Sequence, residues 1–83
     1  MTASTLKAQL TELFADSLGL GADKVVDELR YAEVPQWDSI AHMALIAAIE
    51  ERFDIMIDAE DVINMSSFAA AQAIVAKYIP PQA

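Results

Sequence analysis

The stretch WDSIAHMALIAAIEERF, residues 37–53, decides how this 83-residue chain can fold. When the sequence is placed at about 100° per residue, one sector collects the large apolar side chains of Leu45, Ile46, Ile49 and Phe53. Asp38 or Ser39 can cap such a segment, because short polar side chains accept hydrogen bonds from the first N–H groups of a helix. The stretch therefore predicts a helix over residues 39–53 with a buried stripe.

The opposite side of this predicted helix is also apolar. It carries Ile40, Met43, Ala44 and Ala47, with Glu51 among them and Glu50 nearby. An exposed helix face is normally polar, and a chain of this size cannot sandwich a helix between two layers. The pattern predicts a surface that a partner protein covers part of the time. The alternative is that the alanines only raise helix propensity.

Outward from this helix, three further helices are predicted. The first spans residues 3–18 and ends at Gly19, with a buried stripe of Leu6, Leu10, Leu13, Phe14 and Leu18. A loop follows to Trp37, and its length favours a helical turn near residues 27–30. The expected anchors of this loop to the core are Val25, Val26 and Leu29.

The C-terminal part predicts a loop over residues 54–57 and then two helices. Asp58 is the expected cap of a short helix that runs to Ile63. Ser66 or Ser67 caps the last helix, which runs to Ile79 before Pro80 and Pro81 and buries Phe68, Ala71, Val75, Tyr78 and Ile79. The predicted fold class is all-α: one domain over residues 1–83, a small four-helix bundle of three main helices and one short one, frayed at 1–2 and 80–83.

Composition excludes several classes of function. Thirteen acidic residues against five basic ones give a net charge of −8, which argues against nucleic acid and against an anionic membrane surface. Acidic domains steer toward proteins with basic patches, although acidity also serves solubility. The chain has no cysteine, and therefore no disulfide or thiolate metal site. The apolar run 40–49 is too short to span a bilayer and no signal peptide is visible, so we expect a soluble, cytoplasmic protein.

Ser39 is the main candidate for chemistry. Its hydroxyl is expected beside the free N–H groups and positive dipole of a helix start, where a phosphate is well tolerated. Ser39 and His42 lie one turn apart and could touch, which is compatible with a hydrolase. No glycine-framed nucleophile elbow is present, so this interpretation ranks below a carrier and an adaptor protein. His42 lies near the core sector, which favours a hydrogen-bonded, partly buried histidine.

The acidic residues after the central helix do not predict a metal site. They lack the alternating ligands and central glycine of a calcium loop, and they are better interpreted as a solvated edge: Asp54, Asp58, Glu60 and Asp61.

Taken together, these features resemble the acyl carrier protein family, or phosphopantetheine-binding carrier domains more broadly. The resemblance rests on WDSI at 37–40, LIAAIEERF at 45–53, the acidic turn 57–63 and SSF at 66–68, and the leucine stripe of the first helix extends the match over nearly the whole chain.

The resemblance implies a non-catalytic, monomeric carrier. Ser39 would hold 4′-phosphopantetheine, added from coenzyme A by a phosphopantetheinyl transferase, and Asp38 could help to hold the magnesium used in that transfer. The thiol of the arm would carry an acyl or aminoacyl group as a thioester, supplied by a loading ligase. Downstream enzymes would recognise the second apolar face of the helix, namely Ile40, Met43, Ala44, Ala47, Glu50 and Glu51. The core near Leu45, Ile46 and the last helix would shelter part of the cargo.

One departure from the family's pattern bears on the pathway. Fatty-acid carriers commonly have acidic residues where this chain has Ala41 and Ala44, and a bulkier residue at Ala47. This departure predicts a free-standing carrier for a specialised pathway, whether polyketide, peptide-type, aminoacyl or an unusual lipid. The competing interpretation is a small helical adaptor that binds one protein and carries no prosthetic group.

Overall fold

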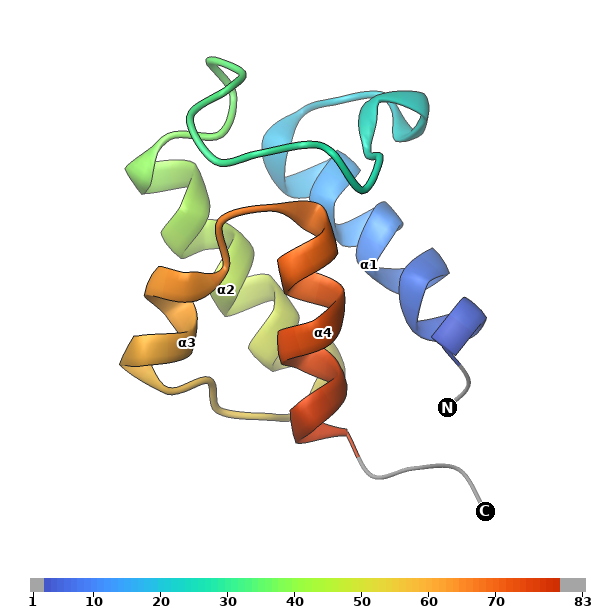
Figure 1. Cartoon of the computed structure of the whole chain (residues 1–83), viewed down its shortest axis with the longest axis vertical. Coiled ribbons are helices and arrows are strands. Elements are labelled where there is room, and N and C mark those ends of the chain that lie inside the picture. Colours follow the sequence, from blue (N-terminus) through green and yellow to red (C-terminus); the bar gives the residue numbers. More distant parts are fainter. Residues whose placement is uncertain (1–2, 80–83) are drawn as a thin grey trace.

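The computed structural model describes residues 3–79 of the chain. Within this range the structure contains four α-helices and a short 3-10 helix, η1 (Figure 1). In chain order these elements are α1 (Ala3–Leu18), η1 (Ala22–Lys24), α2 (Ser39–Phe53), α3 (Ala59–Asn64) and α4 (Phe68–Tyr78). The all-α prediction of three main helices and one short helix is confirmed. The expected fraying at 1–2 and 80–83 lies outside the described residues.

One hydrophobic core lies between the three long helices, with α1 in contact with both α2 and α4. The predicted stripe of α2 is buried at Leu45, Ile46 and Ile49, while Phe53 is half-buried. The centre is aromatic: the ring of Phe14 packs edge-on against Trp37 and Phe68, with centroids 5.3 and 4.9 Å apart. Edge-to-face aromatic pairs of this kind stabilise a small core beyond the area they bury.

The long loop between α1 and α2 differs from the prediction in two respects. Its helical turn is at Ala22–Lys24, and the predicted position near 27–30 holds only a turn. Val25 and Leu29 are buried as expected, but Val26 is 46% exposed. The N–H of Phe68 donates to Leu29 O (2.9 Å) and that of Ala69 to Asp27 O (3.3 Å). Bonds to the start of α4, which local sequence does not reveal, thus fix the backbone at 27–29.

The helix caps follow the sequence closely, with one exception. Ser67 caps α4 through its hydroxyl, which accepts from the N–H of Ala70 at 3.0 Å. Asp58 stands at the N-cap position of α3 but makes no capping hydrogen bond with its side chain. None of the helices within residues 3–79 has the length and apolar character needed to cross a membrane.

Candidate functional site

The start of α2 positions the candidate serine. Asp38 has extended backbone geometry, and its Oδ1 accepts from the N–H of Ala41 at 2.8 Å. Its carbonyl accepts from the N–H of His42, also at 2.8 Å. Ser39 is therefore the first helical residue, and the N–H groups of Ser39 and Ile40 precede the first intrahelical bond. The Ser39 side chain is exposed and forms no hydrogen bond with any described residue.

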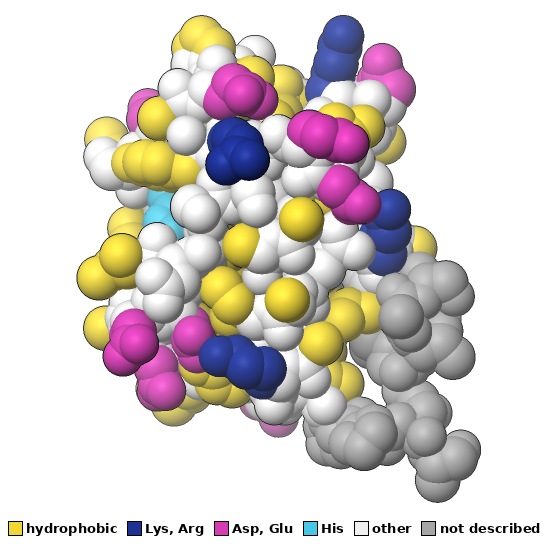
Figure 2. Space-filling view, in the orientation of Figure 1, with side chains coloured by type: hydrophobic (Ala, Val, Ile, Leu, Met, Phe, Trp, Pro, Cys, Tyr) yellow, Lys and Arg dark blue, Asp and Glu magenta, His cyan; other side chains and the backbone are white. Residues whose placement is uncertain are grey.

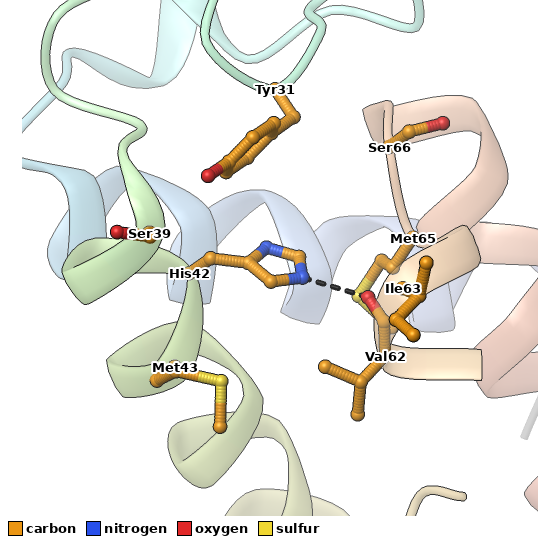
Figure 3. Close-up of a pocket in the computed structure, with 8 residues that line it drawn as sticks. All are labelled: Tyr31, Ser39, His42, Met43, Val62, Ile63, Met65 and Ser66. Carbon is orange, nitrogen blue, oxygen red and sulfur yellow. Dashed lines mark hydrogen bonds between the residues drawn. The ribbon is translucent and has the colours of Figure 1, made fainter. Parts of the chain in front are cut away.

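A chain of hydrogen bonds runs from the residue before Asp38 to α3. The buried indole N–H of Trp37 donates to Nδ1 of His42 at 3.0 Å. Nε2 of His42 lies 2.8 Å from the carbonyl oxygen of Val62 in α3 (Figure 3). Because Nδ1 accepts, the imidazole is neutral with its proton on Nε2, and that proton is donated to Val62. His42 thus ties the loop before Ser39 to the end of α3.

This arrangement removes the hydrolase interpretation. A general base needs a free nitrogen within hydrogen-bond reach of the serine, and both nitrogens of His42 are already engaged. Figure 3 also shows the Ser39 hydroxyl directed away from the imidazole. The expectation of a hydrogen-bonded, partly buried histidine is confirmed by these two contacts and by its 9% exposure.

A pocket of about 330 Å³ opens beside Ser39, between the start of α2, α3 and the long loop (Figure 3). Most of its wall is apolar, and it is lined by Tyr31, Ser39, His42, Met43, Val62, Ile63, Met65 and Ser66. The sequence pointed instead to the core near Leu45 and Ile46 as a shelter for cargo. Neither of these residues lines the pocket, because both face the core between the long helices.

Tyr31 reaches this pocket through contacts of the loop with the segment before α4. Its N–H donates to Ser66 O at 2.9 Å, and its neighbour Arg30 forms an isolated bridge with Ser67. The tyrosine ring packs edge-on against His42, with centroids 5.3 Å apart. Residues 31 and 42 therefore form one side of the pocket, although no sequence spacing links them.

The second face of α2 lies next to the pocket. Ile40 is 81% exposed and Met43 58%, and Ala44, Ala47 and Glu51 are also exposed. Glu50 is half-buried, and its Oε2 accepts from the N–H of Ile57 at 2.9 Å. Figure 2 shows hydrophobic side chains on either side of the single histidine, with acidic side chains gathered farther along, over α3.

A cluster of polar side chains holds α3 to α4. The hydroxyl of Tyr78 donates to Asp61, and the ammonium of Lys77 lies 3.0 Å from Asp61 Oδ1. The hydrogen bond from Tyr78, followed by that from Lys77, lowers the pKa of Asp61. The same bond to Asp61 raises the pKa of Tyr78. Asp61 therefore links α3 to α4, and its side chain is only 14% exposed, so the prediction of a solvated edge is wrong at this residue.

Several lining residues of the pocket were not predicted. Val62, Ile63 and Met65 belong to a helix of six residues and its C-terminal end, which is too short for periodicity to define a face. The one available signal was Ile63, a large apolar residue in an acidic segment, and it is 78% exposed.

Comparison with known proteins agrees with this geometry. The chain matches the family described as "Phosphopantetheine attachment site" over residues 8–71. It is 29% identical over 77 residues to an acyl carrier protein of Akkermansia muciniphila, covering 93% of this chain and 96% of that relative. It is 31% identical over 74 residues to an acyl carrier protein of Buchnera aphidicola, covering 89% and 95%. The chain belongs to the acyl carrier proteins, the non-catalytic carriers of covalently attached phosphopantetheine.

Proposed function

We propose that Ser39 is the residue to which the phosphopantetheine arm is attached. The observation that carries this proposal is the position of its free, exposed hydroxyl at the first residue of α2. The neighbouring N–H groups and the positive end of the helix dipole favour a phosphodiester there. The pocket and the apolar face of α2 both adjoin this hydroxyl, so an attached group has a surface to contact.

The attachment reaction requires only a few groups of this chain. The Ser39 oxygen forms a bond to phosphorus as the pyrophosphate bond of coenzyme A breaks. The adenosine 3′,5′-bisphosphate leaves, and the hydroxyl proton passes to a base on the transferase. Asp38 keeps one oxygen for the helix cap, which leaves its other oxygen able to contact the magnesium of the transferase. Once attached, the arm supplies the thiol that holds cargo as a thioester.

Intact-mass measurement tests the assignment directly. Incubation with coenzyme A and a phosphopantetheinyl transferase should add one arm to the wild-type protein and none to Ser39→Ala. Ser17→Ala, in α1, is the matched control and should be modified like wild type. Modification of Ser39→Ala would show that the attachment residue lies elsewhere.

We propose further that the transferase, a loading ligase and downstream enzymes dock on the second face of α2. This face is defined as Ile40, Met43, Ala44, Ala47, Glu50 and Glu51. Replacement of exposed Met43 by Glu places a charge in the apolar contact and should raise the KM of the transferase about tenfold. Met56→Glu is the control, since Met56 is even more exposed than Met43 but lies outside α2. Equal effects of the two variants would exclude this docking face.

The apolar character of this face favours a specialised pathway over fatty-acid synthesis. Between Ser39 and Ile49, α2 has no acidic residue with which a basic docking patch could pair. We expect a malonyl transferase of fatty-acid synthesis to load the protein with a kcat/KM at least about tenfold below that for its own carrier. Equal loading would place the protein in that pathway. The adaptor interpretation has lost its support, because the chain belongs to a family that carries a prosthetic group.

A further inference from the structure

The long loop between α1 and α2 forms a groove of its own, separate from the pocket beside Ser39. The groove has a volume of about 420 Å³ and shares no lining residue with that pocket. Its apolar lining includes Leu29, which is buried, and Leu20 and Val34, which are half-buried. Val26 also lines the groove and is 46% exposed. The valine that the sequence predicted as an anchor to the core thus contributes apolar surface to the groove instead.

Backbone hydrogen bonds hold the walls of this groove in place. The carbonyl of Val26 accepts from the N–H of Leu29 at 2.9 Å, and the carbonyl of Leu29 accepts from the N–H of Phe68 at 2.9 Å. The carbonyl of Val34 accepts from the N–H of Trp37 at 3.1 Å. The groove is therefore preformed, and a ligand has little of the loop to order when it binds.

The carboxylates at the groove are free to pair with a ligand. Glu28 and Glu33 are exposed, and neither carboxylate forms a hydrogen bond or an ion pair with any residue from 3 to 79. Lys24 is the single cation among the residues that line the groove, and the whole chain has a net charge of −8. The groove thus combines an apolar floor with a negative rim, which favours a ligand with an apolar body and basic groups.

We propose that this groove is a second docking surface of the carrier, and that its occupant is a partner-protein segment in which an aliphatic side chain is flanked by lysine or arginine. The aliphatic side chain packs against Val26 and Val34, and the basic groups pair with Glu28 and Glu33. A volume of about 150 Å³ holds one benzene molecule, so the groove has room for one or two aliphatic side chains.

The place of the groove in the fold suits it to a carrier. The loop crosses the end of the bundle at which α2 begins, so a partner held there lies at the end of the molecule that exposes Ser39 (Figure 1). None of the residues of the docking face on α2 lines the groove. Partner enzymes can therefore be distinguished by a contact that the α2 face does not provide.

An NMR titration with a model peptide tests this surface. The probe is acetyl-KLLK-amide, added to the ¹⁵N-labelled full-length chain, and acetyl-ELLE-amide is the control peptide. The lysine peptide should cause saturable shifts of the amide signals of Leu20, Val26, Leu29 and Val34. Its Kd should be at least about threefold lower than that of the glutamate peptide. Shifts confined to α2, or equal affinity of the two peptides, would overturn the proposal.

A pair of double variants measures the contribution of charge. Glu28→Gln/Glu33→Gln removes both carboxylates of the groove and should raise the Kd of the lysine peptide at least about threefold, an effect that added salt reduces. Asp16→Asn/Glu60→Gln is the matched control, because it removes the same charge from exposed positions in α1 and α3. Equal weakening by the two double variants would mean that the peptide responds only to net charge, which contradicts a specific surface.

A second pair of variants measures the apolar contribution. Val26→Ser shortens an exposed side chain, so the fold should be retained, and it should raise the Kd about threefold. Met56→Ser, at a more exposed position outside the groove, should leave the Kd unchanged. An unchanged Kd in Val26→Ser would exclude the groove as the binding surface.

Two further observations separate this proposal from others. Ser39→Ala should bind the peptide as wild type does, because the inference does not depend on where the arm is attached. A wild-type protein diluted without peptide should show constant shifts at the groove. Shifts that change with protein concentration would mean that a second copy of the chain occupies the groove, and would overturn the proposed occupant.

Discussion

The indole N–H of Trp37 and Nδ1 of His42 are joined by a hydrogen bond of 3.0 Å inside the core. Trp37 precedes α2 and His42 lies in its first turn, so the bond closes a loop of chain around Asp38 and Ser39. His42 passes the connection on to Val62 in α3. The geometry around Ser39 is therefore fixed by a buried polar contact.

A double-mutant cycle measures this bond. Trp37→Phe should lower the free energy of unfolding by about 2 kcal/mol, because it removes a buried donor and some buried volume. His42→Leu should destabilise the protein by a similar amount, since it leaves the buried indole N–H without an acceptor. The double variant should be more stable than the sum of the two losses by about 1 kcal/mol in urea unfolding. Strict additivity would mean that the bond contributes nothing.

Acid should loosen the contact between α3 and α4. The pKa of Asp61 is lowered in the folded protein by the Tyr78 and Lys77 hydrogen bonds. This contribution is complete above the ordinary aspartate pKa and is lost as the pH falls through the lowered value. The urea midpoint should therefore fall between pH 5 and pH 3, less steeply in Tyr78→Phe than in wild type. Parallel profiles for the two proteins would contradict this account.

Ala32 is a position where glycine should be better than the natural residue. Its φ is +64°, a left-handed geometry in which a Cβ costs about 1 kcal/mol or more. Allowing for the greater freedom of glycine in the unfolded chain, Ala32→Gly should stabilise the protein by about 0.5 kcal/mol in urea unfolding. Ala73→Gly, within α4, should instead destabilise by about 1 kcal/mol. A loss of stability in both variants would contradict the argument.

Substitutions of the adjacent acids Glu50 and Glu51 should differ in their effects on stability. Glu50→Ala removes the acceptor of the Ile57 N–H and should cost about 1 kcal/mol of stability. Glu51 is exposed, so Glu51→Ala should change stability by less than about 0.5 kcal/mol. The same Glu51 variant should raise the transferase KM, and salt should reduce that difference. A wild-type KM in Glu51→Ala would remove this residue from the docking face.

Much of the fold could be predicted from local signals. Helical spacing predicted α1 and α2, Gly19 and the prolines predicted where helices end, and Ser67 predicted the cap of α4. Each of these signals depends on neighbouring residues only. The conformation of the loop between α1 and α2 was harder to predict. Its conformation depends on backbone bonds from residues 27–31 to residues 66–69, and no local pattern encodes such long-range pairs.

The candidate site was likewise predictable only in part. The exposure of Ser39 and the burial of His42 followed from their positions on one helix. The pocket did not, because Tyr31, Val62 and Met65 come together only through tertiary contacts. Leu45 and Ile46 do not line the pocket for the same reason: a core stripe shows which residues are buried but not where space remains between elements.

The stacking of Trp37 on His42 gives the chain its own optical reporter. Trp37 is the single tryptophan of the sequence, and it lies two positions before Ser39 and stacks on His42, which lines the pocket. Its emission therefore arises from one place, and a group that contacts His42 changes the surroundings of the fluorophore. Loading and unloading of the carrier can be followed in real time without a dye.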